Sequence, residues 1–135
     1  MKVFITSSFQ GNKNKEDIEY LCKLVNKSGF IDFSFIRDIE NYEKKFNNSK
    51  DLMNKAKEEI KKCDALLIDM TNKPTGRAIE AGIAYSYDKK IITIMKKGTK
   101  IKDTTKGISD IIIEYNKIED IVEPLKLFFN EVSEN

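Results

Sequence analysis

Short runs of β-branched and aromatic residues recur along the chain, and each is separated from the next by a helical or turn-rich stretch. Runs of this kind, about 4–8 residues long, are typical of buried β-strands. The intervening stretches are long enough for the crossover connections that parallel strands require. The alternation therefore predicts a parallel α/β sheet. The five predicted strands cover residues 2–6, 30–35, 64–70, 90–95 and 110–115.

Three other segments have apolar residues at the three- to four-residue spacing of an amphipathic helix. In the first, Ser28-Gly29 is a typical helix end, and the second begins with a capping Asn48 or Ser49. In the third, we expect Leu127 to pack with its apolar neighbours, while Pro124 marks either the start of the helix or a kink. These helices are predicted within residues 14–30, 48–63 and 118–132.

The predicted strands suggest where a ligand binds. Five parallel strands commonly take the order 2-1-3-4-5, which predicts a three-layer, flavodoxin- or Rossmann-like fold with helices on both faces. Ligands then bind beyond the carboxyl ends of the first and third strands. The loops leaving those strands, residues 6–12 and 69–76, both carry hydroxyl groups and a glycine, so we expect them to converge on one crevice. The first loop has the hydroxyls of Ser7 and Ser8 for an anion, but such strand ends are also ordinary turns.

The composition fits one globular domain spanning residues 1–135. Of the 135 residues, 40% are hydrophobic and 10% aromatic, which suits a single buried core. Lys and Arg number 24 against 22 Asp and Glu, and the two signs are mixed along the chain. The net charge of +2 forms no concentrated basic field, so we expect no polynucleotide partner.

The sequence also lacks the patterns of a membrane protein and of a zinc site. Its apolar runs are far shorter than the ~20 residues needed to cross a bilayer, and Met1 leads into a strand pattern rather than a signal peptide. We therefore expect a soluble, cytoplasmic protein with no membrane partner. His is absent, and Cys22 and Cys63 lack metal-ligand spacing, so we expect no metal and no Cys-His dyad. Any catalysis must then depend on carboxylates, hydroxyls or Lys.

Glu80 lies in the first turns of a further predicted helix. With Thr75 as the N-cap, this helix begins at Gly76 and places Glu80 on its second turn. One interpretation is a surface carboxylate that pairs with Arg77, worth a few tenths of a kcal/mol. The other is a carboxylate in the crevice facing a ligand, because small residues let the helix approach the sheet closely. These small residues are Ala78, Ala81, Gly82 and Ala84.

Three segments carry the features of a known family. They are KVFITSSFQG (2–11), CDALLIDMTNKPTGRAIEAGIAYSYDKKIITI (63–94) and GISDIIIEYNKIEDI (107–121). The middle segment has a strand, an acidic residue, a Gly and then Glu-x-Gly-x-Ala, in that order. Together they resemble the nucleoside 2-deoxyribosyltransferase superfamily, and within it most closely the 2'-deoxynucleoside 5'-monophosphate N-hydrolases.

This resemblance implies a role for Glu80. It matches the family's nucleophile, which attacks the anomeric carbon of the sugar and displaces the base, leaving a glycosyl-enzyme ester. Water or a second base then resolves the ester, which makes the protein a hydrolase or a transferase of nucleosides or their 5'-monophosphates. No cofactor is implied, and a homodimer is expected whose partner subunit helps to close the pocket. The implied substrate-binding residues are Thr6, Ser7, Ser8, Phe9, Gln10, Gly11 and Gly76.

The sequence differs from the family pattern at the position of the acid that protonates the leaving base. The family has an Asp about two helical turns before the Asp that begins the third strand, and Ala56 occupies that place here. Glu59 is one possible substitute. Asp69, at the end of the third strand, is the other candidate acid, because an acidic pair with Glu80 can keep one member protonated. Alternatively, Asp69 caps the following turn.

Two further departures concern the phosphate. Pro74 lies where the monophosphate hydrolases have a phosphate-binding Ser, and Thr75 is its possible replacement. Gln10 lies where an Arg is familiar, which lowers the positive charge offered to a phosphate. A free nucleoside, a nucleotide with a different sugar and a larger nucleotide are therefore also candidate substrates.

Two other functions are compatible with the sequence. The first is a non-catalytic nucleotide-binding module that keeps the crevice and lacks the acid at Ala56. The second is a TIR-like domain that cleaves or senses NAD, suggested by VFITSSF (3–9) and a helical Glu. EAGIAY (80–85) fits the deoxyribosyltransferase pattern better.

Overall fold

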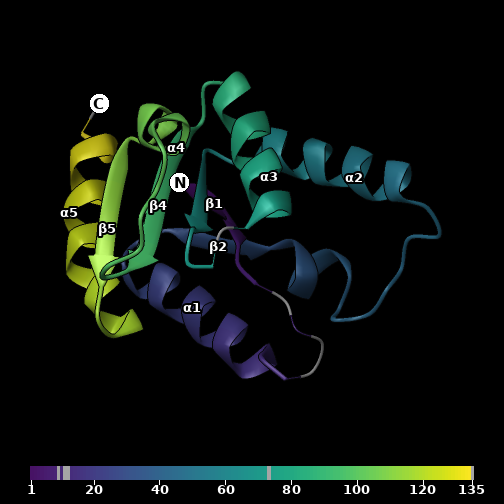
Figure 1. Cartoon of the computed structure of the whole chain (residues 1–135), viewed down its shortest axis with the longest axis horizontal. Helices are drawn as coiled ribbons and strands as arrows, with labels where there is room; N and C mark the ends of the chain where they lie inside the picture. Colours follow the sequence, from purple (N-terminus) through teal and green to yellow (C-terminus); the bar gives the residue numbers. More distant parts are fainter. Residues whose placement is uncertain (9, 11–12, 73, 135) are drawn as a thin grey trace.

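Five parallel strands form one sheet in the computed structural model, which describes residues 1–8, 10, 13–72 and 74–134. The strand order is β2-β1-β3-β4-β5 (Figure 1). This order confirms the α/β fold class and the strand order predicted from the sequence. The strands are β1 (Lys2–Thr6), β2 (Ile31–Ser34), β3 (Ala65–Asp69), β4 (Lys90–Lys96) and β5 (Ile111–Tyr115).

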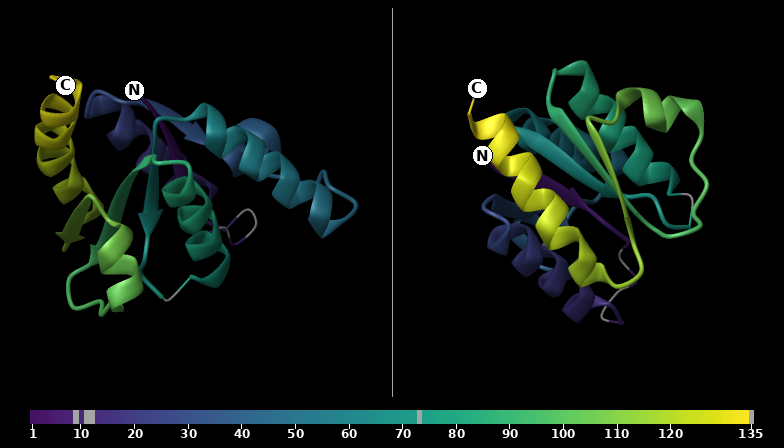
Figure 2. Two further views of the ribbon diagram at one scale, coloured as in Figure 1. Left: turned by 90° about the horizontal axis from the view of Figure 1, so that it is seen from above. Right: turned by 90° about the vertical axis from the view of Figure 1, so that its left-hand side faces the viewer.

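Helices cover both faces of the sheet (Figure 2). On one face lie α1 (Lys15–Lys27) and α5 (Val122–Ser133). On the other lie α2 (Ser49–Lys62), α3 (Thr75–Ser86) and the short α4 (Asp103–Ile108). A single π-helical turn, η1 (Phe35–Ile39), follows β2, and a 3₁₀ turn, η2 (Ile118–Ile121), precedes α5.

Side chains alternate between the two faces along each strand, because successive Cβ atoms point to opposite sides of a sheet. On β1, Val3 and Ile5 belong to the core cluster beneath α1 and α5. Phe4 belongs to the second cluster, beneath α2 and α3. β3 alternates in the same way, with Leu67 in the first cluster and Leu66 in the second. The same alternation places successive polar residues at the strand ends on opposite faces of the sheet.

Helix boundaries differ in detail from the predictions. Asn48 caps α2 as expected, since its side-chain oxygen accepts from the Asp51 amide. Pro74, rather than Thr75, is the N-cap of α3 and makes no side-chain capping bond. Pro124 lies in the first turn of α5, two residues after the helix begins at Val122, where the missing N–H of proline has no helical partner to lose.

The burial of three side chains bears on the core. Leu127 is 70% exposed and does not join the core, because it lies on the outer face of α5, away from the buried Leu125 and Phe128. Cys22 and Cys63 are free and buried, and unpaired cysteines in such positions pack as small apolar residues. Burial raises the pKa of both thiols, that of Cys22 to about 12 and that of Cys63 to about 11.

The described residues also bear on membrane insertion and on metal binding. None of the helices there combines the length and the apolar character that crossing a membrane needs. Over the same part of the chain, His, Cys, Asp and Glu side chains form no group of three or more that could hold a metal ion.

Candidate active site

A pocket of about 190 Å³ lies at the carboxyl end of β1, between η1, α2 and α3. Its described walls are mostly apolar, and its polar and small members come from four elements of the chain. We call it the Glu80 pocket. These members are Thr6, Glu40, Ala56, Gly76 and Glu80.

Glu80 is held in this pocket by the end of β1. The Thr6 hydroxyl donates a hydrogen bond of 2.8 Å to Glu80 Oε1, and Thr6 itself is only 6% exposed. Burial raises the pKa of Glu80 to about 7, against the lowering effects of the Thr6 hydrogen bond and of the Arg77 charge. Because a buried carboxylate keeps a strong affinity for a proton and for other electrophiles, Glu80 has the character of a nucleophile or base.

Arg77 does not form the surface ion pair that the first interpretation of Glu80 required. Its guanidinium donates instead to the backbone carbonyl oxygens of Asp69 (2.7 Å) and Thr71 (3.4 Å). No ion pair joins Arg77 to Glu80 within the described residues. The structure thus favours the second interpretation, in which the helix carries Glu80 into the crevice.

The start of α3 leaves room for a ligand beside Glu80. A Cβ added to Gly76 would meet no atom within 4 Å, although Gly76 lines the Glu80 pocket. The space that a side chain would fill is therefore open, as the resemblance implied. Ala81 and Ala84 are buried against the sheet, whereas Ala78 and Gly82 line a separate pocket beside α4.

A second pocket, of about 290 Å³, lies on the α1 side of the sheet. We call it the Asp69 pocket, and its described lining includes Ser7, Ser8, Asp69, Lys96 and Tyr115. Asp69 Oδ1 accepts from the Thr71 amide at 2.9 Å, and Oδ2 accepts from the Tyr115 hydroxyl at 2.7 Å. Both oxygens of Asp69 are thus engaged in holding the turn after β3.

The predicted site residues are distributed over the two pockets. Thr6, Gly76 and Glu80 lie together, whereas Ser7, Ser8 and Asp69 lie in the other pocket. Gln10 donates its backbone N–H to Asn14 Oδ1 at 2.8 Å, and Thr75 is exposed at the start of α3. Phe9 and Gly11 lie outside the described residues.

The acid expected near Ala56 has no direct replacement on α2. Ala56 lines the Glu80 pocket, so the family position of this acid does face the site. Glu59 is 6% exposed and forms ion pairs with Lys55 (3.2 Å) and Lys62 (3.4 Å). Burial opposes ionisation, but the two lysines lower the pKa of Glu59, so it is unsuited to donate a proton.

Glu40 is a polar residue of the pocket that no pattern in the sequence had indicated. It follows η1, lines the Glu80 pocket and is half-buried. Burial raises its pKa. Its signal in the sequence was its position, because it closely follows the second strand at the edge of the sheet where ligands bind.

Comparison with known proteins gives a match in structure only. No family model and no curated protein matches the sequence. The CMP N-glycosidase BcmB of Clostridium botulinum is similar in structure, with a TM-score of 0.70 and 23% identity, over 95% of this chain and 99% of that chain. A 2-deoxyribosyltransferase of Bacillus psychrosaccharolyticus has a TM-score of 0.71 and 18% identity, over 90% of each chain. The chain has the fold of these two proteins.

Proposed function

We propose that this protein cleaves the N-glycosidic bond of a nucleoside or of its 5'-monophosphate, with Glu80 as the nucleophile. The observation that carries the proposal is the Glu80 carboxylate, held by the Thr6 hydroxyl at 2.8 Å in a largely apolar pocket. The pocket lies at the carboxyl end of the strand beside the switch point, where folds of this type bind ligands.

The proposed chemistry follows from the surroundings of Glu80. The ionised carboxylate attacks the anomeric carbon, and the apolar walls strengthen its attraction to the developing positive charge of the sugar. Thr6 fixes the orientation of the carboxylate, and the open space at Gly76 admits the sugar beside α3. Water or an acceptor base then resolves the ester, giving hydrolysis or transfer.

The size of the pocket and the activities for which the two similar structures are named support this substrate class. At about 190 Å³, the Glu80 pocket is smaller than the roughly 300–1,000 Å³ of drug-sized sites, so we propose that it takes the sugar while the rest of the nucleotide lies outside. One similar structure is named as a CMP N-glycosidase and the other as a 2-deoxyribosyltransferase. The homodimer and the cytoplasmic location remain predictions.

Release of the free base tests the proposal. The parent, Glu80→Gln and the exposed control Glu123→Gln are incubated with ribo- and deoxyribonucleosides and their monophosphates, with and without an acceptor base, followed by chromatography. We expect release by the parent and the control only, and acceptor dependence separates transferase from hydrolase.

Two results would contradict the proposal. If no substrate releases its base while nucleotides still raise the melting temperature of the parent, the protein is a binding module. NAD is added to the same panel, and if NAD is cleaved while the nucleosides and monophosphates are not, the TIR-like alternative is correct.

A further inference from the structure

A second carboxylate, that of Glu40, lines the same pocket as Glu80. Within the described part of the chain, the Glu40 carboxylate has no hydrogen-bond or ion-pair partner. Glu40 also lines a small neighbouring pocket together with Lys44. Glu40 is thus an acidic side chain that reaches the site and is not engaged in holding the fold.

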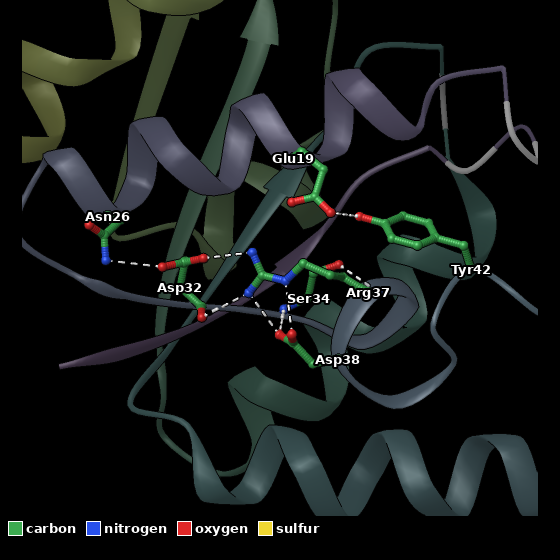
Figure 3. A network of polar contacts seen from close by, with 7 residues as sticks. All are labelled: Glu19, Asn26, Asp32, Ser34, Arg37, Asp38 and Tyr42. Atoms are coloured by element: carbon green, nitrogen blue, oxygen red, sulfur yellow. Dashed lines mark hydrogen bonds and ion pairs between the residues drawn. The ribbon is translucent and has the colours of Figure 1, made fainter.

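An ion-pair network holds the turn from which Glu40 projects (Figure 3). Arg37 lies between two carboxylates, with 2.8 Å contacts to Asp32 and to Asp38. The backbone N–H of Glu40 donates to the Phe35 carbonyl oxygen at 3.0 Å, which closes the π-helical turn. The network therefore fixes η1 to the end of β2, and with it the starting point of the Glu40 side chain.

The proposed reaction needs a proton donor, and the other acidic candidates are unsuitable. A departing base accepts a proton or a hydrogen bond as the glycosidic bond breaks. Ala56 has no acidic group, Glu59 is paired with two lysines, and both oxygens of Asp69 are bonded in the other pocket. Among the described residues, Glu40 and Glu80 are the only acids that line the Glu80 pocket.

We propose that Glu40 is the acid–base residue of this site. It supplies the proton that Ala56, which has no acidic group, cannot donate. This inference rests on the proposed function. In the first step a Glu80 oxygen bonds to the anomeric carbon, the C–N bond breaks with its electron pair going to the base, and the base takes the Glu40 proton. In the second step the oxygen of water bonds to the anomeric carbon, the ester bond breaks to free Glu80, and Glu40 takes the proton of the water.

The two carboxylates of the pocket influence each other's protonation. Burial raises the pKa of Glu40, and the charge of Glu40 in turn raises the pKa of Glu80. Two carboxylates in one apolar pocket resist ionising together, so the pair keeps one proton over an interval of pH. The charge of Arg77 on α3 lowers the pKa of Glu80, and Lys44, after η1, lines the small pocket beside Glu40.

The role of Glu40 is tested with bases that differ in how much they need a proton to leave. Guanine methylated at N7 leaves without needing a proton, and 5-fluorouracil leaves more readily than uracil, so each is paired with its natural counterpart on the same sugar. We expect Glu40→Gln to slow release of the natural base by about 10²-fold or more, and to slow release of N7-methylguanine by less than about fivefold, with an intermediate loss for 5-fluorouracil.

Glu43→Gln is the matched control, because Glu43 is an exposed carboxylate three residues along the same segment. It should match the parent on every substrate. Glu40→Asp keeps a carboxyl group, and we expect it to restore part of the rate on natural bases. Melting curves of each variant establish that it is folded.

The outcomes separate this inference from the function on which it rests. Equal losses on natural and activated bases, or no loss at all, would overturn the acid–base role while base release by the parent still supports the proposed function. A parent that releases neither kind of base would overturn both.

Discussion

The two pockets at the carboxyl end of the sheet lie on opposite faces, and their carboxylates differ in how many of their oxygens accept hydrogen bonds. In the Asp69 pocket, both oxygens of Asp69 accept hydrogen bonds, one from the Thr71 amide and one from the Tyr115 hydroxyl. In the Glu80 pocket, Thr6 donates to one oxygen of Glu80, and no donor within the described residues reaches the other. A carboxylate with both oxygens engaged stabilises a turn, whereas one with a free oxygen beside an open cavity is available for reaction.

The largest expected effect is on catalysis at Glu80. Glu80→Gln removes the nucleophile while keeping the shape of the side chain, so we expect base release to fall by about 10³-fold or more. Asp69→Asn should lower the rate by about tenfold or less, because Asp69 acts through the turn. Steady-state rates of base release measure both. Equal losses would remove the distinction between the two pockets.

The second effect is on stability and on the pH dependence of the rate. Because burial raises the pKa of Glu80 to about 7, its ionised form opposes folding above that pH, and stability falls as pH rises from about 4.5 to 7. Glu80→Gln should therefore stabilise the fold by about 2 kcal/mol at pH 8, allowing for partial solvent screening, with little gain at pH 4.5. Urea unfolding at both pH values measures the difference.

The same titration predicts that kcat/KM of the parent rises with pH through about 7, as Glu80 becomes ionised, and falls again once the proposed acid, Glu40, has also lost its proton. A pH-independent difference in stability, together with a flat rate profile, would indicate that Glu80 is not the buried titrating group.

The third effect concerns the open space at Gly76. Gly76→Ala adds a methyl group to a residue that lines the Glu80 pocket, so we expect kcat/KM to fall by about tenfold through poorer positioning of the sugar, without loss of stability. Gly82→Ala is the matched control, because Gly82 lies on the same helix and an added Cβ there also meets no atom within 4 Å. A similar loss of activity in both variants would point to the helix rather than to the pocket.

The smallest effect is expected in the Asp69 pocket. Tyr115→Phe removes the hydroxyl that donates to Asp69, which should cost about 1 kcal/mol of unfolding free energy. We expect base release to change less than about threefold, because the affected carboxylate does not line the Glu80 pocket. Thermal unfolding and rate assays on the same preparation measure the loss of stability and the change in rate. A large loss of rate with unchanged stability would assign Asp69 to catalysis.

Much of the fold was predictable because its signals are local. The β-branched runs, the helical periodicity and the Asn48 cap each depend on neighbouring residues, and the strand order follows from a common arrangement of parallel sheets. Leu127 was mispredicted because an apolar residue on the outer face of a helix joins the core only if another element covers it.

The candidate site was predictable only in part. The local sequence places Glu80 on the second turn of α3, and the resemblance implied its role. Glu40 carries no local motif, and its place in the pocket depends on η1, a turn that Arg37 fixes through Asp32 and Asp38. Such a contact between side chains of different elements has no periodic signal in the sequence.

The sequence by itself determined the five strands, the alternation of side chains along them and the carboxylate at the start of α3. Only the tertiary structure decided which polar residues share a pocket: Thr6 meets Glu80 across 74 positions of the chain, while the next residue, Ser7, lines the pocket on the opposite face. The physical reason is that successive strand residues point to opposite faces, and what covers each face depends on helices far away in the sequence.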